Sequence, residues 1–121
     1  MIRILIADDS GLICDAIRTV LDQEKDIYVV GCARTREEAE FLQGHAGILL
    51  VGPALNGDST LEFVRSVNVE DTGKKVIVVG IPSDPELITK YIEAGALGYV
   101  SRQESMSRLV EKIRAVNSGQ A

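Results

Sequence analysis

The sequence predicts a single α/β domain, in which helices cover both faces of a parallel sheet. Short runs rich in Val, Ile and Leu alternate with amphipathic segments along the whole chain. The apolar runs show no strict alternation, which is typical of parallel strands buried on both faces. A length of 121 residues suits one domain with one substantial core.

Five of the apolar runs are predicted to be strands. Helical segments separate them, so the chain reads as five consecutive βα units with right-handed crossovers. The common sheet order for five such units is 2-1-3-4-5. The predicted strands are Ile2–Ala7, Ile27–Ala33 and residues 47–52, 75–80 and 97–101.

The first three helices begin at recognisable capping residues. Ser10 is the expected N-cap of the first helix. The pairs Thr35 with Glu38 and Ser59 with Glu62 have the spacing of capping boxes, and they predict the starts of the second and third helices.

The last two helices have clear limits or a clear apolar face. Asp84-Pro85 predicts the start of the fourth helix, and Gly95 predicts its end. The fifth helix is expected to fray near Asn117. Its predicted apolar face consists of Met106, Leu109, Val110, Ile113 and Val116.

Composition restricts the class of function. The net charge is −5, and 26% of residues are charged, so the field of this chain does not favour DNA or anionic membranes. No apolar run approaches the roughly 20 residues that span a bilayer. We expect a cytoplasmic protein in which Cys14 and Cys32 are reduced thiols in or near the core. Arg34 and Arg36 are expected on a solvated face.

The domain is expected to occupy residues 1–117. Residues 118–121, Ser-Gly-Gln-Ala, read as the start of a linker. We expect this linker to lead to an output domain that is absent from the chain.

The ends of the first and third predicted strands differ in their chemistry. The first strand leads into Asp8-Asp9, whereas the third ends at Gly52. Parallel strands bring their carboxyl ends to one crevice, where a third carboxylate could complete a cation site and act as a nucleophile. Gly52 has no side chain for either role.

Three segments resemble the receiver domain of bacterial two-component response regulators of the NarL/FixJ type. They are residues 3–9 (RILIADD), 76–79 (VIVV) and 95–100 (GALGYV). The resemblance covers nearly the whole chain. It implies a flavodoxin-like or CheY-like three-layer sandwich.

The resemblance also implies where the family's phosphotransfer groups would lie. Asp8 and Asp9 match its two metal-binding acids, whereas Gly52 stands at the phospho-acceptor, Gly80 at the hydroxyl and Arg102 at the lysine position. In the family, Mg²⁺ and the lysine offset phosphate charge. We therefore expect no catalytic residue here. Asp8 and Asp9 are expected to be vestigial metal ligands that bind Mg²⁺ weakly or not at all.

Two interpretations of the retained acids remain open. In one, Asp9 accepts backbone N–H groups at the start of the first helix, while Asp8 faces the crevice. In the other, Arg102 enters the crevice, pairs with Asp8 and holds the domain in one state. Tyr99 matches the family's aromatic switch position, and it is also consistent with an ordinary tyrosine packed on the fifth strand.

The preferred functional hypothesis is a degenerate receiver that signals without phosphorylation and is not an enzyme. It would bind a protein partner or a second copy, through the fourth helix, fifth strand and fifth helix or through the first and fifth helices. DNA would be contacted only by an attached output domain, through which the protein would regulate transcription.

Two alternatives stay open. The receiver could still be phosphorylated at an unconventional acceptor, Asp58 or Ser59. It could instead sense a small molecule in the crevice that Gly52 and Gly80 enlarge, where backbone N–H groups could bind an anion.

Overall fold

A computed structural model confirms the predicted parallel sheet. The model describes residues 1–55, 58–69 and 73–119, and for residues 54, 58, 59, 68 and 69 it describes the backbone alone. Its five strands lie in the order β2-β1-β3-β6-β7, and every neighbouring pair is parallel. This is the predicted 2-1-3-4-5 order. The strands are β1 (Ile2–Ala7), β2 (Ile27–Ala33), β3 (Ile48–Val51), β6 (Lys75–Ile81) and β7 (Gly98–Ser101).

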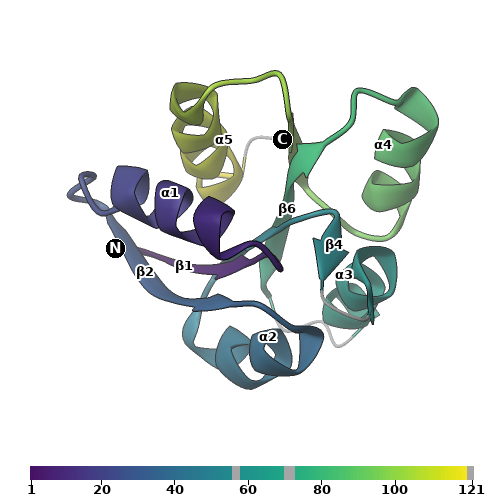
Figure 1. Ribbon diagram of the computed structural model, residues 1–121, viewed down its shortest axis with the longest axis horizontal. Coiled ribbons are helices and arrows are strands. Elements are labelled where there is room, and N and C mark those ends of the chain that lie inside the picture. Colours follow the sequence, from purple (N-terminus) through teal and green to yellow (C-terminus); the bar gives the residue numbers. More distant parts are fainter. Residues whose placement is uncertain (56–57, 70–72, 120–121) are drawn as a thin grey trace.

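Five helices cover the two faces of this sheet. Figure 1 shows α1 and α5 together on one face and α2, α3 and α4 on the other. Each face has its own cluster of buried apolar side chains, so the sheet is the middle of three layers. The helices are α1 (Gly11–Leu21), α2 (Arg36–Leu42), α3 (Thr60–Val69), α4 (Pro85–Glu93) and α5 (Met106–Asn117), with a short 3₁₀ turn, η1, at Gln43–His45.

A small antiparallel pair, which the sequence pattern did not predict, follows β3. It consists of β4 (Ala54–Leu55) and β5 (Asp58–Ser59). The intervening Asn56-Gly57, which lies outside the described residues, is a sequence typical of tight hairpin turns. The Asn56-Gly57 dipeptide was the one feature of the sequence that could have predicted this strand pair. It is easily overlooked because two-residue strands are too short to show a periodic pattern.

The predicted caps of three helices are confirmed. The Ser10 hydroxyl accepts the N–H of Ile13 at 3.2 Å, and the Thr35 hydroxyl accepts that of Glu38 at 3.1 Å. The Asp84 carboxylate accepts a backbone N–H at the start of α4. The predicted cap of α3 depends on the Ser59 side chain, which lies outside the described residues.

The apolar face predicted for α5 is largely confirmed. Leu109, Val110, Ile113 and Val116 are buried, whereas Met106 in the first turn is 37% exposed. Met106 departs from the prediction because it lines an open cavity rather than the packed core. Within the described part of the chain, no helix is long and apolar enough to cross a membrane.

Candidate functional site

A cavity opens at the carboxyl end of the sheet, between α1 and α5. Its volume is about 500 Å³, and its walls come from both helices and from the ends of β1, β6 and β7. This is the crevice that the sequence predicted for the family's phosphotransfer site. The structure therefore brings Asp8, Asp9, Gly80 and Arg102 to one place.

Gly52 lies directly beside Asp8, and its backbone is held from both sides. The Gly52 N–H donates to the Ala7 carbonyl at 2.8 Å, and the buried Thr60 hydroxyl donates to the Gly52 carbonyl at 2.9 Å. A Cβ added to Gly52 would overlap Oδ2 of Asp8 and lie 2.8 Å from its Cγ. The Asp8 carboxylate thus occupies the space into which an acceptor side chain would extend.

Asp8 faces the crevice, as one interpretation predicted, but the hydrogen bond that this interpretation gave to Asp9 is made by Asp8. Asp8, not Asp9, accepts a backbone N–H at the start of α1, from Ser10 at 2.8 Å. Asp9 is exposed.

Burial raises the pKa of the Asp8 carboxyl. The Ser10 N–H opposes this change by stabilising the carboxylate, and the neighbouring charge of Asp9 adds to it. Because desolvation is the largest cause, the ionised form of Asp8 carries a net free-energy cost in the folded state.

The residues present do not fit the magnesium site that the family implies. Such a site needs several carboxylate oxygens directed at one point, and the third carboxylate position is Gly52. Among the described residues, no three acidic, histidine or cysteine side chains gather in a way that could hold a metal ion. Weak Mg²⁺ binding at Asp8 and Asp9 stays a prediction.

Gly80, at the hydroxyl position, has a backbone role. Its φ is +83°, and the pairing of β6 with β7 shifts register between Val79 and Ile81. Such a left-handed residue at a bulge favours glycine. A Cβ there would meet no atom within 4 Å, so the absent side chain leaves open space.

Arg102, at the lysine position, is exposed and lies over Gly80. Its Nε donates to the Gly80 carbonyl at 3.5 Å, and its backbone N–H donates to the Ile81 carbonyl at 3.0 Å. The proposed pairing with Asp8 is not formed among the contacts of the described residues. The side-chain contact of Arg102 is instead with β6, at the Gly80 carbonyl.

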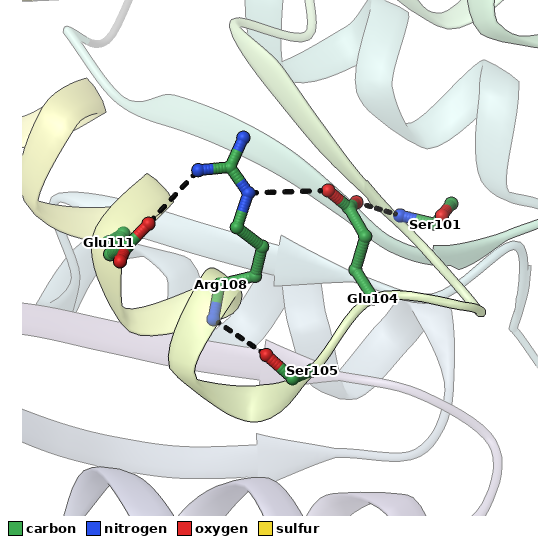
Figure 2. Close-up of polar contacts among 5 residues, drawn as sticks. All are labelled: Ser101, Glu104, Ser105, Arg108 and Glu111. Atoms are coloured by element: carbon green, nitrogen blue, oxygen red, sulfur yellow. Dashed lines mark hydrogen bonds and ion pairs between the residues drawn. The ribbon is translucent and has the colours of Figure 1, made fainter.

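The segment between β7 and α5 is fixed by its own polar contacts, as Figure 2 shows. The Glu104 carboxylate accepts the Ser101 N–H at 2.7 Å and lies 3.5 Å from the Arg108 guanidinium. Arg108 also contacts Glu111 at 3.0 Å, and the Ser105 hydroxyl caps α5 by accepting the Arg108 N–H. The Glu104 carboxylate is therefore already bonded within the segment between β7 and α5.

Arg34 has a role that the sequence did not predict. It is exposed, yet its Nε and Nη2 donate to the Asp9 carbonyl at 3.3 and 3.1 Å. A Cβ on Gly11 would come within 3.3 Å of the same guanidinium. The expected exposure of Arg34 is confirmed, but Arg34 also bridges the end of β2 to the turn before α1. Long-range contacts of this kind leave no sequence signal.

The two cysteines are neighbours on α1 and β2, and both are free thiols. The Cys14 thiol donates to the Asp8 carbonyl at 3.6 Å and is buried. Burial, with the adjacent Cys32 thiol, raises the pKa of Cys14 to about 12. Cys14 therefore stays protonated at neutral pH and acts as a core residue beneath the crevice.

Exposed apolar side chains occur on both predicted interaction faces. Tyr99 on β7 is 38% exposed, and Leu97, just before β7, and Ile92, on α4, are 46% and 45% exposed. On the other face, Leu12 is 80% exposed and Ile13 is 40% exposed. Each face could bury apolar surface against another protein.

The strand order, the three layers and the acidic crevice define a CheY-like α/β domain. Residues 4–114 match the family described as the response regulator receiver domain. The chain therefore belongs to the response regulator receiver domain family.

Its relatives are response regulators. The chain is 33% identical over 122 residues to the response regulator UvrY of Escherichia coli K12, with 99% of this chain and 56% of UvrY matched. It thus spans about half the length of the curated relatives it matches. A LuxR-family two-component response regulator from Aurantimonas sp. SI85-9A1 has a similar structure, with a TM-score of 0.90, 25% identity and coverage of 98% of this chain and 86% of that one.

The isolated receiver domain of RcsB from Salmonella enterica serovar Typhimurium, solved in the presence of the phosphomimetic BeF₃⁻, is also similar. Its TM-score is 0.89 at 20% identity, and the match covers 98% of this chain and 90% of that one. This likeness concerns the fold.

Proposed function

We propose that the chain is a degenerate receiver domain that signals without phosphorylation of its crevice. The observation that carries the proposal is the contact between Gly52 and Asp8. The acceptor position has no nucleophile, and the space for one is filled by a carboxylate that the Ser10 N–H holds in place.

The surrounding positions support the same conclusion. Gly80 offers no hydroxyl, and the Arg102 guanidinium is directed at the Gly80 carbonyl. A phosphoryl group in the crevice would therefore lack both of the family's usual side-chain contacts. Output would then depend on the surface of the domain rather than on a chemical change in the crevice.

We infer that this output is an interaction with a protein partner or with a second copy of the chain. The exposed apolar side chains of the α4–β7–α5 face and of the α1–α5 face are the two candidate surfaces. By analogy with its longer relatives, the domain would regulate transcription through an attached DNA-binding domain in the cytoplasm, and it would have no enzymatic activity of its own.

Phosphoryl transfer is tested by incubating the chain with acetyl phosphate and Mg²⁺ and measuring its intact mass. We expect no gain of one phosphoryl group, whereas a receiver domain with aspartate at the acceptor position gains one under the same conditions. A stoichiometric gain would contradict the proposal. Peptide mapping would then show whether Asp8, Asp58 or Ser59 carries the group.

The choice between the two surfaces is tested by analytical ultracentrifugation of two variants. Leu12→Ser alters the α1–α5 face, and Tyr99→Ser alters the α4–β7–α5 face. If a second copy is the partner, one variant loses self-association and the other keeps it. A wild-type chain that stays monomeric at all concentrations would leave a different protein as the partner.

A further inference from the structure

The cavity between α1 and α5 has the size of a ligand site. At about 500 Å³, it falls within the range of small-molecule pockets, which is roughly 300–1,000 Å³. A side chain at position 80, which lines the cavity, would have narrowed its polar end. Gly80 in particular leaves open space, because no other atom lies within 4 Å of the point that a Cβ would occupy.

The walls of the cavity are largely apolar. Ile13 and Ile17 contribute from α1, and Met106 and Leu109 contribute from α5. Ile17 and Leu109 are buried at the base, whereas Ile13 and Met106 are 40% and 37% exposed. The apolar lining thus extends from the sheet to the mouth, and it would accept an apolar body of matching length.

The polar end of the cavity carries more negative than positive charge. Asp8, Asp9 and Glu104 are carboxylates, and Arg102 is the cation among the lining residues. Glu104 is engaged with Ser101 and Arg108, and Arg102 lies on the Gly80 carbonyl. Oδ1 of Asp8 accepts the Ser10 N–H, and no cationic side chain of the described residues forms an ion pair with its carboxylate.

We propose that this cavity binds a small amphipathic organic cation, a primary ammonium with an apolar body. The ammonium would pair with the Asp8 carboxylate, and the body would lie between Ile13 of α1 and Met106 of α5. An anion would meet three carboxylates, and a bare divalent metal would find too few oxygen donors. The charge thus favours a cation over the anion that the backbone N–H groups suggested from sequence.

Binding would couple the cavity to the surface. A ligand body between Ile13 and Met106 covers apolar area that belongs to the α1–α5 face. This inference rests on the proposed function, because a crevice that accepts phosphate would not keep Asp8 available for an ammonium. Ligand occupancy would then be the input that phosphorylation supplies in other receivers.

The test uses the full chain, labelled with ¹⁵N, and three probes with similar shapes. These are 2-phenylethylammonium, neutral 2-phenylethanol and anionic 3-phenylpropionate, titrated in the absence of any phosphodonor. We expect saturable amide shifts confined to the cavity lining for the ammonium, and affinity at least about tenfold weaker for the other two, since an ion pair with the half-buried Asp8 carboxylate is lost. Equal affinity for the three probes, or no saturable shift with the ammonium, overturns the proposal.

Matched variants locate the interaction. Asp8→Asn keeps the shape of the side chain and removes its charge, so we expect about a tenfold loss of affinity for the ammonium. Ile13→Trp fills the mouth and should weaken the ammonium and the neutral probe alike. Asp15→Asn, an exposed change on α1 away from the cavity, should leave binding unchanged.

The outcomes separate this inference from the proposed function. Asp8→Asn binding as tightly as the wild type, in a variant whose amide spectrum shows it folded, overturns the ligand site alone. A mass gain with acetyl phosphate overturns the proposed function and is measured without any ligand. Saturable shifts with Mg²⁺ alone at the Asp8 and Asp9 amides, together with no response to the ammonium, would assign the site to a metal instead.

Discussion

The core of the sheet and its carboxyl edge lie one residue apart, yet they follow different constraints. Val51 at the end of β3 is fully buried, and it packs in the apolar cluster beneath α2, α3 and α4. Gly52, the next residue, is where the family's chemistry would begin. The core requires only apolar volume of the right shape, whereas phosphotransfer requires one functional group at one point. A domain can therefore keep a packed core while it lacks the groups for phosphotransfer.

The edge shows a further difference between its two glycines. Gly52 is crowded by Asp8, whereas Gly80 faces open space but has a positive φ. A side chain at position 52 would thus clash with Asp8. A side chain at position 80 would meet no neighbour, but it would strain the backbone at a positive φ. Restoring the family's groups is expected to cost stability at both positions, for different reasons.

The largest effect is expected in the core. Phe63→Ala removes a fully buried ring from the cluster under α3, and it should lower the free energy of unfolding by about 3–5 kcal/mol because a cavity remains. Urea denaturation followed by circular dichroism measures this value. A loss below about 1 kcal/mol would show that the core relaxes to fill the space.

At Gly52, the expected cost is intermediate and depends on Asp8. Gly52→Ala should destabilise the domain by about 1–3 kcal/mol because its Cβ displaces the Asp8 carboxylate. In an Asp8→Ala background, most of this cost should disappear. A double-mutant cycle measures the coupling, and additive effects of the two changes would contradict the overlap.

Gly52→Asp should also fail to restore phosphorylation-dependent switching, because the hydroxyl and lysine positions remain Gly80 and Arg102. Native mass spectrometry and the sedimentation behaviour with and without acetyl phosphate test this expectation. A phosphate-dependent change in assembly in the single variant would show that Gly52 alone accounts for the loss.

Gly80→Ala isolates the backbone effect. The left-handed conformation of Gly80 should cost an alanine about 1 kcal/mol, while the open space around it adds no steric penalty. Thermal denaturation measures the change. A neutral result would indicate that the bulge between β6 and β7 relaxes to a negative φ.

The smallest effect concerns the charge of Asp8. Its folded-state pKa is raised by burial, so ionisation costs stability as the pH rises through that pKa. Asp8→Asn, which can still accept the Ser10 N–H, should therefore be more stable than the wild type at pH 7. We expect less than about 1 kcal/mol, since solvent screens a half-buried group.

The gain from Asp8→Asn should shrink as the pH falls below the unfolded-state pKa, where the wild-type carboxyl is protonated in both states. Unfolding curves at pH 7 and at pH 3 test this dependence. A gain that is larger at pH 3 would contradict the assigned cause.

The sequence by itself predicted the helix starts at Ser10, Thr35 and Asp84 and favoured the common sheet order, while the resemblance to receiver domains implied which positions meet in the crevice. These features depend on local capping and on the pattern of buried residues, both of which are written along the chain. The glycine at the end of the third strand, Gly52, was equally visible, because the position of a strand end follows from the pattern.

Only the tertiary structure shows how the side chains around the crevice are arranged. Asp8 lies against Gly52, Arg102 turns toward Gly80, and Arg34 reaches Asp9 from the end of β2. Each arrangement depends on how a side chain is oriented toward a segment far away in the sequence. The pattern of residue types along the chain does not indicate this orientation. The cavity between α1 and α5 is a result of the same kind, since its volume is set by how two helices pack on one sheet.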